Sequence, residues 1–193
     1  MEAKILIITG HPTPQSFCSA LSDAYMEGAL SSKAQVRTID LSKIEFNPNL
    51  KFGYHQRTEL EDSLKEAQEL ISWANHLVFV YPTWWGAMPA ILKGFIDRVF
   101  LPGFAFKYRK NSPLWDKLLT GKSAHLIVTM DTPSWYYRLI YRRAGHSVMK
   151  RNILQFCGIS PVRITEIGPV KSLSDVLRVK WLDKVKRLGS KLA

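Results

Sequence analysis

The chain has 193 residues, a formal net charge of +11 and 46% hydrophobic residues, a fraction typical of a packed fold and too high for a disordered chain. Its two cysteines, Cys18 and Cys157, exclude a disulfide framework and any multi-cysteine zinc or iron–sulfur site. We therefore expect one domain over residues 1–193, located in the cytoplasm, with no signal peptide and no membrane-inserted segment.

The first part of the chain alternates strand and helix patterns. The apolar run at 4–9 (KILIIT) predicts a strand buried on both faces. Apolar residues repeating at three- to four-residue spacing then predict a helix over 17–29. The run at 36–41 mixes polar and apolar residues, so it predicts a strand near the edge of a sheet.

The middle of the chain continues this alternation. A clear helical pattern covers 60–74, and Thr58 with Glu61 predicts a capping box at its start. The run at 77–81 (LVFVY) predicts a second buried strand. A helix over 89–100 follows, opened by a proline at its first position, where the missing N–H sacrifices no intrahelical bond.

The last part of the chain adds two strands and two helices. Buried strands are predicted at 124–130 and 162–167, with a helix over 146–156 between them that Gly158 ends. The final helix is expected to start at Ser172 and to bury a leucine- and tryptophan-containing stripe.

The alternating order indicates an α/β fold with a doubly wound, five-stranded parallel sheet and helices on both faces. No repeat, low-complexity tract or linker divides the chain. The first strand lacks a GxGxxG motif after it, which disfavours a dinucleotide-binding Rossmann site. Three long connections, 42–57, 101–121 and 131–145, match neither pattern, and we expect them to carry functional or partner contacts.

In such sheets, ligands bind beyond the carboxyl ends of the strands. After the first predicted strand, His11 and two prolines form a stiff turn that leads into a helix opening near Ser16. The free N–H groups and positive dipole end of that helix suit a phosphate group. A rigid helix cap without a ligand fits the same residues.

Two further segments follow predicted strands at the same edge. After 77–81, the adjacent residues Trp84 and Trp85 suit a flat aromatic ligand, although a buried aromatic plug or a dimer interface also fits them. After 124–130, the Thr132 hydroxyl and neighbouring backbone amides suit the polar edge of such a ring, or form a plain turn.

Together these segments resemble a known family, the flavodoxin-like NAD(P)H:quinone oxidoreductases, which also contains flavoprotein regulators of potassium-efflux channels. The most specific match is PTWWGAMPAILKGFIDRVF at 82–100, followed by GFAFKY at 103–108. The opening HP at 11–12 with SF at 16–17, and ILQFCG at 153–158, add support. The resemblance spans roughly residues 4 to 168.

This resemblance implies a non-covalently bound flavin, reduction by NADPH or NADH, a quinone or nitroaromatic acceptor, and a homodimer with sites shared across its interface. It also implies a two-step cycle, in which hydride passes to the flavin and two electrons then pass to the acceptor. A chain this short has little material to hold an adenosine half, which favours FMN over the alternative FAD.

The resemblance also carries cofactor-binding positions onto this sequence, in three groups. The phosphate turn would be formed by His11, Ser16, Phe17 and Cys18; one flank of the isoalloxazine by Pro82, Thr83, Trp84 and Trp85; the other side by Thr129, Met130, Asp131 and Thr132. The sequence departs from the family twice. Position 18 is often Asn in the family, and a Thr-Thr-Gly-Gly loop is replaced here by Thr129–Pro133.

No side-chain nucleophile is expected, because the cofactor performs the redox step. Donors that steady negative charge on reduced flavin or on the hydroquinone would assist, and the catalytic candidates are Tyr108, Tyr137 and His146. No metal site is expected, since the remaining histidines lack clustered carboxylates.

Other single residues receive structural interpretations. Cys157 is expected to be a buried small apolar residue, and Trp115 to be a dimer contact. Asp97 and Arg98 are expected to make surface or interface contacts.

Two other classes of function remain open. One is a flavin-binding regulatory subunit of a membrane transport protein. The other is a nucleic-acid or acidic-surface binder that uses the arginines and tyrosines of 136–151, although no nucleic-acid-binding motif accompanies them. The same basic segment lies where a nicotinamide cofactor would approach, which favours NADPH as donor. The basic residues of the last helix are expected to form a solvated face.

Overall fold

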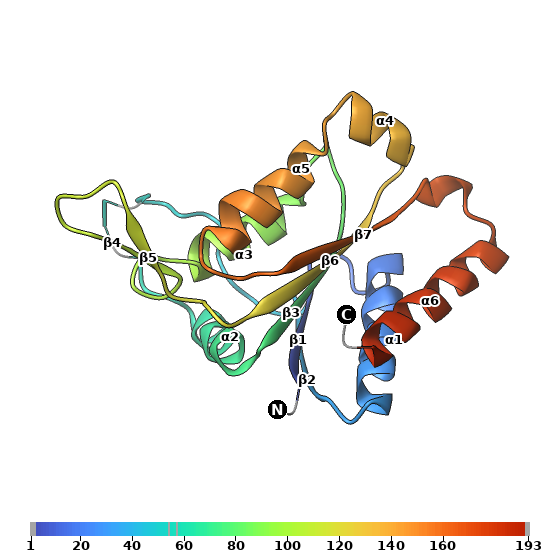
Figure 1. The fold of residues 1–193 in the computed structure, drawn as a ribbon, viewed down its shortest axis with the longest axis horizontal. Helices are drawn as coiled ribbons and strands as arrows, with labels where there is room; N and C mark the ends of the chain where they lie inside the picture. The colour runs from blue at the N-terminus through green and yellow to red at the C-terminus, as the bar shows by residue number, and fades with distance from the viewer. Residues whose placement is uncertain (1–2, 54, 57, 192–193) are drawn as a thin grey trace.

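The computed structural model describes residues 3–53, 55–56 and 58–191 and confirms the predicted α/β fold. A parallel five-stranded sheet has the order β2-β1-β3-β6-β7 (Figure 1). Its strands are β1 (Lys4–Thr9), β2 (Gln35–Asp40), β3 (His76–Pro82), β6 (Ser123–Thr129) and β7 (Val162–Ile167). Each prediction falls within one residue of the strand observed, and the mixed strand does lie at an edge.

Helices cover both faces of the sheet, and alternate strand residues divide the core between them. Ile5 and Ile7 of β1 pack with α1 (Phe17–Ser31) and α6 (Asp175–Ser190) on one face. Leu6 and Ile8 face the opposite layer, formed by α2 (Asp62–Trp73), α3 (Ala90–Val99) and the π-helix η1 (Val148–Gln155). The strands are therefore apolar on both sides because both sides are covered.

The helices α1 and α6 approach each other closely at two glycines. A Cβ added at Gly28 would overlap the carbonyl oxygen of Lys186, and one at Gly189 would overlap that of Tyr25. The absence of side chains at these two positions therefore sets the distance between the two helices.

The predicted capping box of α2 is wrong. Glu61 occupies the N-cap position without a side-chain cap bond, and its carboxylate accepts hydrogen bonds from Arg98 and from the Asn47 N–H. Arg98 is almost fully buried, so the expectation that it makes surface contacts is also wrong. Its guanidinium additionally donates to the backbone oxygens of Asn47 and Glu59. A buried charge requires such partners. The Glu61 carboxylate therefore pairs with Arg98 and does not cap the backbone N–H groups at the start of α2.

The long connections contain short elements that periodicity did not predict. Strands β4 (Phe106–Tyr108) and β5 (Trp115–Lys117) form an antiparallel hairpin within 101–121. The 131–145 segment contains α4 (Ser134–Leu139), which extends beyond the sheet in Figure 1, and the start of α5 (Ala144–Ser147).

Three helix ends differ from their predictions. The helix expected over 146–156 is α5 followed by η1, so most of it is a π-helix. Pro89 is the N-cap of α3 and not its first residue. A short 3-10 turn, η2 (Val170–Ser172), precedes α6, and Ser174 caps α6 in place of Ser172.

A buried polar network lies at the amino ends of β3 and β6. His76 Nδ1 lies 2.7 Å from Ser123 Oγ, and its Nε2 lies 3.4 Å from Tyr25 Oη on α1. His125 Nε2 lies 2.8 Å from Thr165 Oγ1 on β7. These contacts tie β3 to α1 and β6 to β7. Burial lowers the pKa of His76 to about 4.

The two edges of the sheet are β2 and β7. On β2, Arg37 is exposed, and its guanidinium lies 4.5 Å from the ring centroid of Trp73. β7 is flanked by Pro161 and Pro169, and its middle residues, which include Arg163 and Glu166, are exposed or half-buried.

Candidate functional site

The amino end of α1 follows the first strand, as predicted. Ser16 caps the helix by accepting a hydrogen bond of 3.1 Å from the Ser19 N–H. The N–H groups of Phe17 and Cys18 belong to the first turn, where a helix has no internal acceptors for them. They are available to an anion beside the positive end of the helix dipole.

The Cys18 side chain points into the protein and not toward this helix end. Its Sγ lies 3.4 Å from Thr129 Oγ1, and the residue is buried. Burial raises the pKa of the thiol to about 11, so the group is uncharged near neutral pH. Position 18 therefore offers only its backbone N–H to a ligand, while its side chain ties α1 to the end of β6.

Two tryptophans lie on a tight hairpin after β3. The backbone N–H and C=O groups of Trp84 bond with those of Ala87, at 2.8 and 3.0 Å. The turn places Trp85 and Gly86 at positive φ, 50° and 77°, and leaves the Trp85 side chain fully exposed. The ring of Trp84 stands edge-on to that of His11, 5.7 Å away, so the first two predicted segments meet.

The third segment joins the second through the backbone. The Thr83 N–H donates to the Thr129 carbonyl at 2.6 Å, and Pro82 pairs with Thr129 in the sheet register. The Met130 side chain is buried, so only its backbone can face a ligand. Thr132, two residues further on, is half-buried, and its side chain can also face a ligand. The carboxylate of Asp131 accepts a hydrogen bond of 2.9 Å from the Lys171 N–H and lies 3.3 Å from Lys171 Nζ.

Tyr137 and His146 lie together behind the hairpin, and both are buried. Tyr137 Oη donates to the Gly86 carbonyl at 3.0 Å, and its ring lies 4.9 Å from that of His146. Burial raises the pKa of Tyr137 and lowers that of His146. The tyrosine hydroxyl holds the tryptophan hairpin in place.

A carboxylate that the sequence did not single out completes this cluster. Glu166 Oε1 on β7 lies 2.8 Å from Arg143 Nε and 3.3 Å from His146 Nε2. The signal in the sequence was an acidic residue in a predicted strand that also carries Arg163. Glu166 therefore connects β7 to the start of α5, close to Tyr137.

Arg178 on α6 is a second residue near the candidate site that the sequence analysis did not predict. Its guanidinium lies 5.3 Å from the ring centroid of Phe17 and donates to the Val170 carbonyl at 3.1 Å. It is half-buried, unlike most basic residues of α6, and it brings a positive charge to the amino end of α1.

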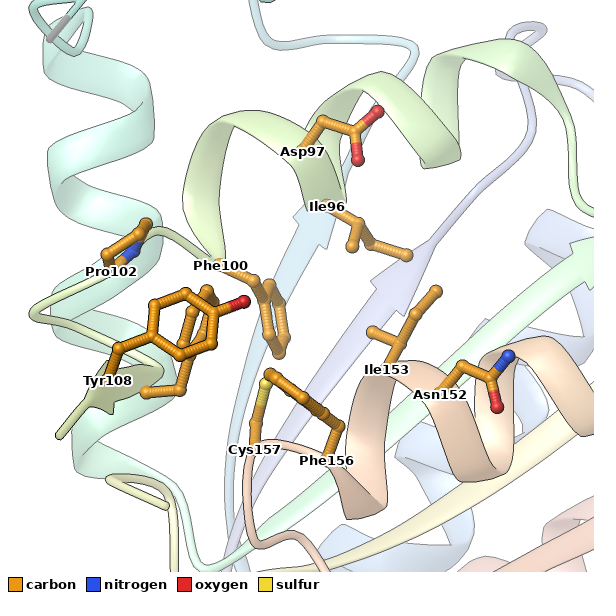
Figure 2. A pocket seen from close by; sticks show the side chains of 10 residues that line it. Ile96, Asp97, Phe100, Pro102, Tyr108, Asn152, Ile153, Phe156 and Cys157 are labelled. Carbon is orange, nitrogen blue, oxygen red and sulfur yellow. The ribbon is translucent and has the colours of Figure 1, made fainter. Parts of the chain in front are cut away.

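Tyr108, the third catalytic candidate, lies elsewhere. It borders an apolar groove of about 470 Å³ between α3, β4 and η1, shown in Figure 2. Phe100 and Phe156 line the groove, with the buried Cys157 at one side and Asn152 and Asp97 at its rim. Trp115 stacks on Phe156 with ring centroids 4.4 Å apart. Within one chain, β4, which ends at Tyr108, lies apart from α4 and α5, which carry Tyr137 and His146 (Figure 1).

The described residues contain no group of three or more His, Cys, Asp or Glu side chains arranged to hold a metal ion. None of their helices is both long and apolar enough to span a membrane.

Comparisons with known proteins give a consistent set of relatives. A family model described as a flavodoxin-like fold matches residues 3–185. The ribosyldihydronicotinamide dehydrogenase-like protein traD of Penicillium crustosum is 34% identical over 152 residues, covering 66% of this chain and 57% of that protein.

Two solved structures superpose over nearly the whole chain. Smu.1420 from Streptococcus mutans UA159 has a TM-score of 0.83 and 37% identity, covering 97% of this chain and 98% of that one. The NAD(P)H:quinone oxidoreductase from Methanothermobacter marburgensis has a TM-score of 0.83 and 25% identity, covering 100% of this chain and 98% of that one.

Proposed function

Because the chain belongs to the flavodoxin-like family, we propose that it is a flavin-dependent NAD(P)H dehydrogenase that reduces quinone-like acceptors. One observation carries the proposal. The helix opening at Ser16, the tryptophan hairpin and the segment after β6 meet at the carboxyl edge of the sheet, linked by the His11–Trp84 and Thr83–Thr129 contacts. Ligands of open α/β sheets bind at this edge.

The residues present suit a flavin phosphate and a flat ring. The first-turn N–H groups of α1, with the Ser16 hydroxyl and the nearby Arg178, form a donor set for a phosphate group. Trp84 and Trp85 expose aromatic surface on one side, and the 129–132 backbone supplies polar groups on the other. The pairing of Asp131 with Lys171 offsets the negative charge that could oppose an anionic reduced flavin.

When bound, the flavin would accept hydride from NAD(P)H and return two electrons to the acceptor. The residues of this chain orient it and shape its surroundings. The Tyr137 hydroxyl fixes the carbonyl of Gly86 and thereby the position of Trp84 and Trp85. The ring of His146 packs edge-on against that of Tyr137, and its Nε2 lies 3.3 Å from Glu166 Oε1.

The cofactor is expected to be FMN, with FAD as the alternative. Extraction of the flavin from purified protein, followed by chromatography against FMN and FAD standards, identifies it directly. Steady-state oxidation of NADPH and NADH with a panel of quinones and nitroaromatics then tests turnover. Purified protein that lacks flavin absorbance and takes up neither cofactor on reconstitution would contradict the proposal.

We also propose that two copies of the chain associate through the groove that Tyr108 borders. The groove is mainly apolar, and β4, which ends at Tyr108, lies apart from α4 and α5 of its own chain (Figure 1). The family resemblance implies sites shared between subunits, an arrangement in which Tyr108 of one copy would donate a hydrogen bond in the site of the other.

Light scattering during size-exclusion chromatography tests this association. Ile153→Glu places a charge in the groove and should yield a monomer. Val179→Glu, at an exposed apolar position on α6, is the matched control and should leave a dimer intact. A wild-type monomer at micromolar concentration would contradict the association.

A regulatory role on a membrane transport protein is the second candidate, favoured only by the family resemblance. A flavin-containing protein whose NADPH oxidation stays at background with every acceptor would support it over the enzyme.

A further inference from the structure

The segment after the candidate flavin site is strongly basic. Residues 132–165 contain six Lys and Arg residues and no Asp or Glu: Arg138, Arg142, Arg143, Lys150, Arg151 and Arg163. It begins at Thr132, the last residue of the third site segment, and continues directly into α4. A positive region next to a redox site attracts anionic reactants.

A shallow groove of about 320 Å³ lies along α4 within this segment. Its lining is Ser134, Trp135, Arg138, Leu139 and Arg143. Residues three and four apart share one face of a helix, so Trp135, Arg138 and Leu139 project together. The groove thus combines a large exposed aromatic ring with a guanidinium group.

The two arginines of the groove differ in their partners. Arg143 is paired with Glu166, with 2.8 Å between Nε and Oε1, so much of its charge is offset within the protein. Among the described residues, no carboxylate pairs with Arg138, and its side chain is exposed. Arg138 is therefore the cation that remains available to an anionic ligand.

The exposed Trp135 ring packs against a chain of tyrosine rings. The ring of Trp135 stands edge-on to Tyr136 with centroids 5.6 Å apart, and Tyr136 stands edge-on to Tyr141 at 5.4 Å. Tyr141 in turn contacts Tyr137, which is buried. A ring supported in this way loses little freedom when a second flat ring stacks on it.

We propose that this groove binds the adenosine end of NADPH, with Trp135 stacked on the adenine and Arg138 paired with the 2′-phosphate. A guanidinium matches the geometry of a phosphate group and forms two charge-assisted hydrogen bonds with it. NADH carries a hydroxyl at that position, so Arg138 makes NADPH the preferred donor. The inference rests on the proposed function, since it takes the donor to be a nicotinamide nucleotide.

The first test is direct binding and needs no turnover. Isothermal titration compares adenosine 2′,5′-bisphosphate with adenosine 5′-monophosphate, which lacks the 2′-phosphate. Wild-type protein should bind the bisphosphate about tenfold more tightly, and Arg138→Gln should remove that preference. Arg151→Gln, an equal loss of charge on the exposed side of η1 in the same carboxylate-free segment, should retain it. Trp135→Ala should weaken both ligands to a similar extent.

Equal affinity of wild-type protein for the two nucleotides would overturn the inference, as would equal losses in Arg138→Gln and Arg151→Gln. The second test compares kcat/KM for NADPH and NADH. Arg138→Gln should lower the value for NADPH while leaving that for NADH within about twofold, because only NADPH carries the 2′-phosphate.

The two proposals fail separately. If the bisphosphate preference is present but no acceptor is reduced, the proposed enzyme function fails and the groove assignment stands. If quinones are reduced equally well with both donors by wild type and by Arg138→Gln, the function stands and the groove assignment fails.

Discussion

The buried His76 should make the stability of the protein depend on pH in a defined window. In the folded state its pKa is lowered to about 4 from an ordinary value of 6.5, mainly by burial, with Coulombic contributions from His125 and Arg163. The unfolded chain therefore binds a proton at His76 more readily than the folded chain does. The stabilising contribution is complete above pH 6.5 and is lost as the pH falls from 6.5 toward 4.

The size of the effect follows from this difference in pKa. Each pKa unit corresponds to about 1.4 kcal/mol, so His76 accounts for about 3 kcal/mol of lost unfolding free energy by pH 4. Urea unfolding followed by circular dichroism between pH 7.5 and pH 4 measures it. His76→Asn retains a polar group near Ser123 Oγ but does not titrate, so its stability should fall by about 3 kcal/mol less over this range.

His55→Asn is the matched control, because His55 is an exposed histidine of the described chain and its replacement should preserve the wild-type pH dependence. Carboxylates titrate in all three proteins. Subtracting the change in unfolding free energy of one protein from that of another therefore removes the contribution of the carboxylates. If wild type and His76→Asn lose the same free energy between pH 7.5 and pH 4, the reasoning from burial is refuted.

Three substitutions test other parts of the structure. Trp85→Ala should change the free energy of unfolding by less than about 0.5 kcal/mol, because the side chain is fully exposed, while lowering flavin content or acceptor turnover; unchanged values of both would contradict the assignment of the hairpin. Gly28→Ala should destabilise the fold by more than about 2 kcal/mol in urea unfolding, because its Cβ meets the backbone of Lys186; a stability equal to wild type would disprove the close crossing. Arg98→Met should cost about 3 kcal/mol and expose the chain near Asn47 and Glu61 to limited proteolysis, since Glu61 loses its partner; protease resistance equal to that of wild type would contradict this role of Arg98.

The strands and their parallel arrangement could be predicted because burial on both faces of the sheet determines which residues they contain. Ile7 and Val78 belong to strands whose interior positions are all apolar, and a sheet covered on both faces accommodates such runs. The site segments were predicted for the same reason. Once the strands are parallel, the residues that follow them meet at one edge.

The residues that were predicted wrongly or missed depend on contacts distant in sequence. Arg98 follows an aspartate on a helix, which is typical of an exposed position, yet it is buried and donates to the Asn47 carbonyl. Glu61 matched a capping box because no local signal reveals a partner 37 residues away. Nothing in the sequence around Cys18 indicated that its thiol faces Thr129 and not the amino end of α1. Strands β4 and β5, at three residues each, are too short for periodicity to register.

The two edge strands of the sheet disfavour backbone pairing between copies of this protein. An exposed strand normally offers its backbone as a template for another chain, which leads to aggregation and to fibrils. Here β2 presents Arg37, whose charge resists burial in a continuous sheet, and β7 lies between Pro161 and Pro169, which have no N–H to donate. Association of copies by backbone pairing at either edge of the sheet is therefore disfavoured.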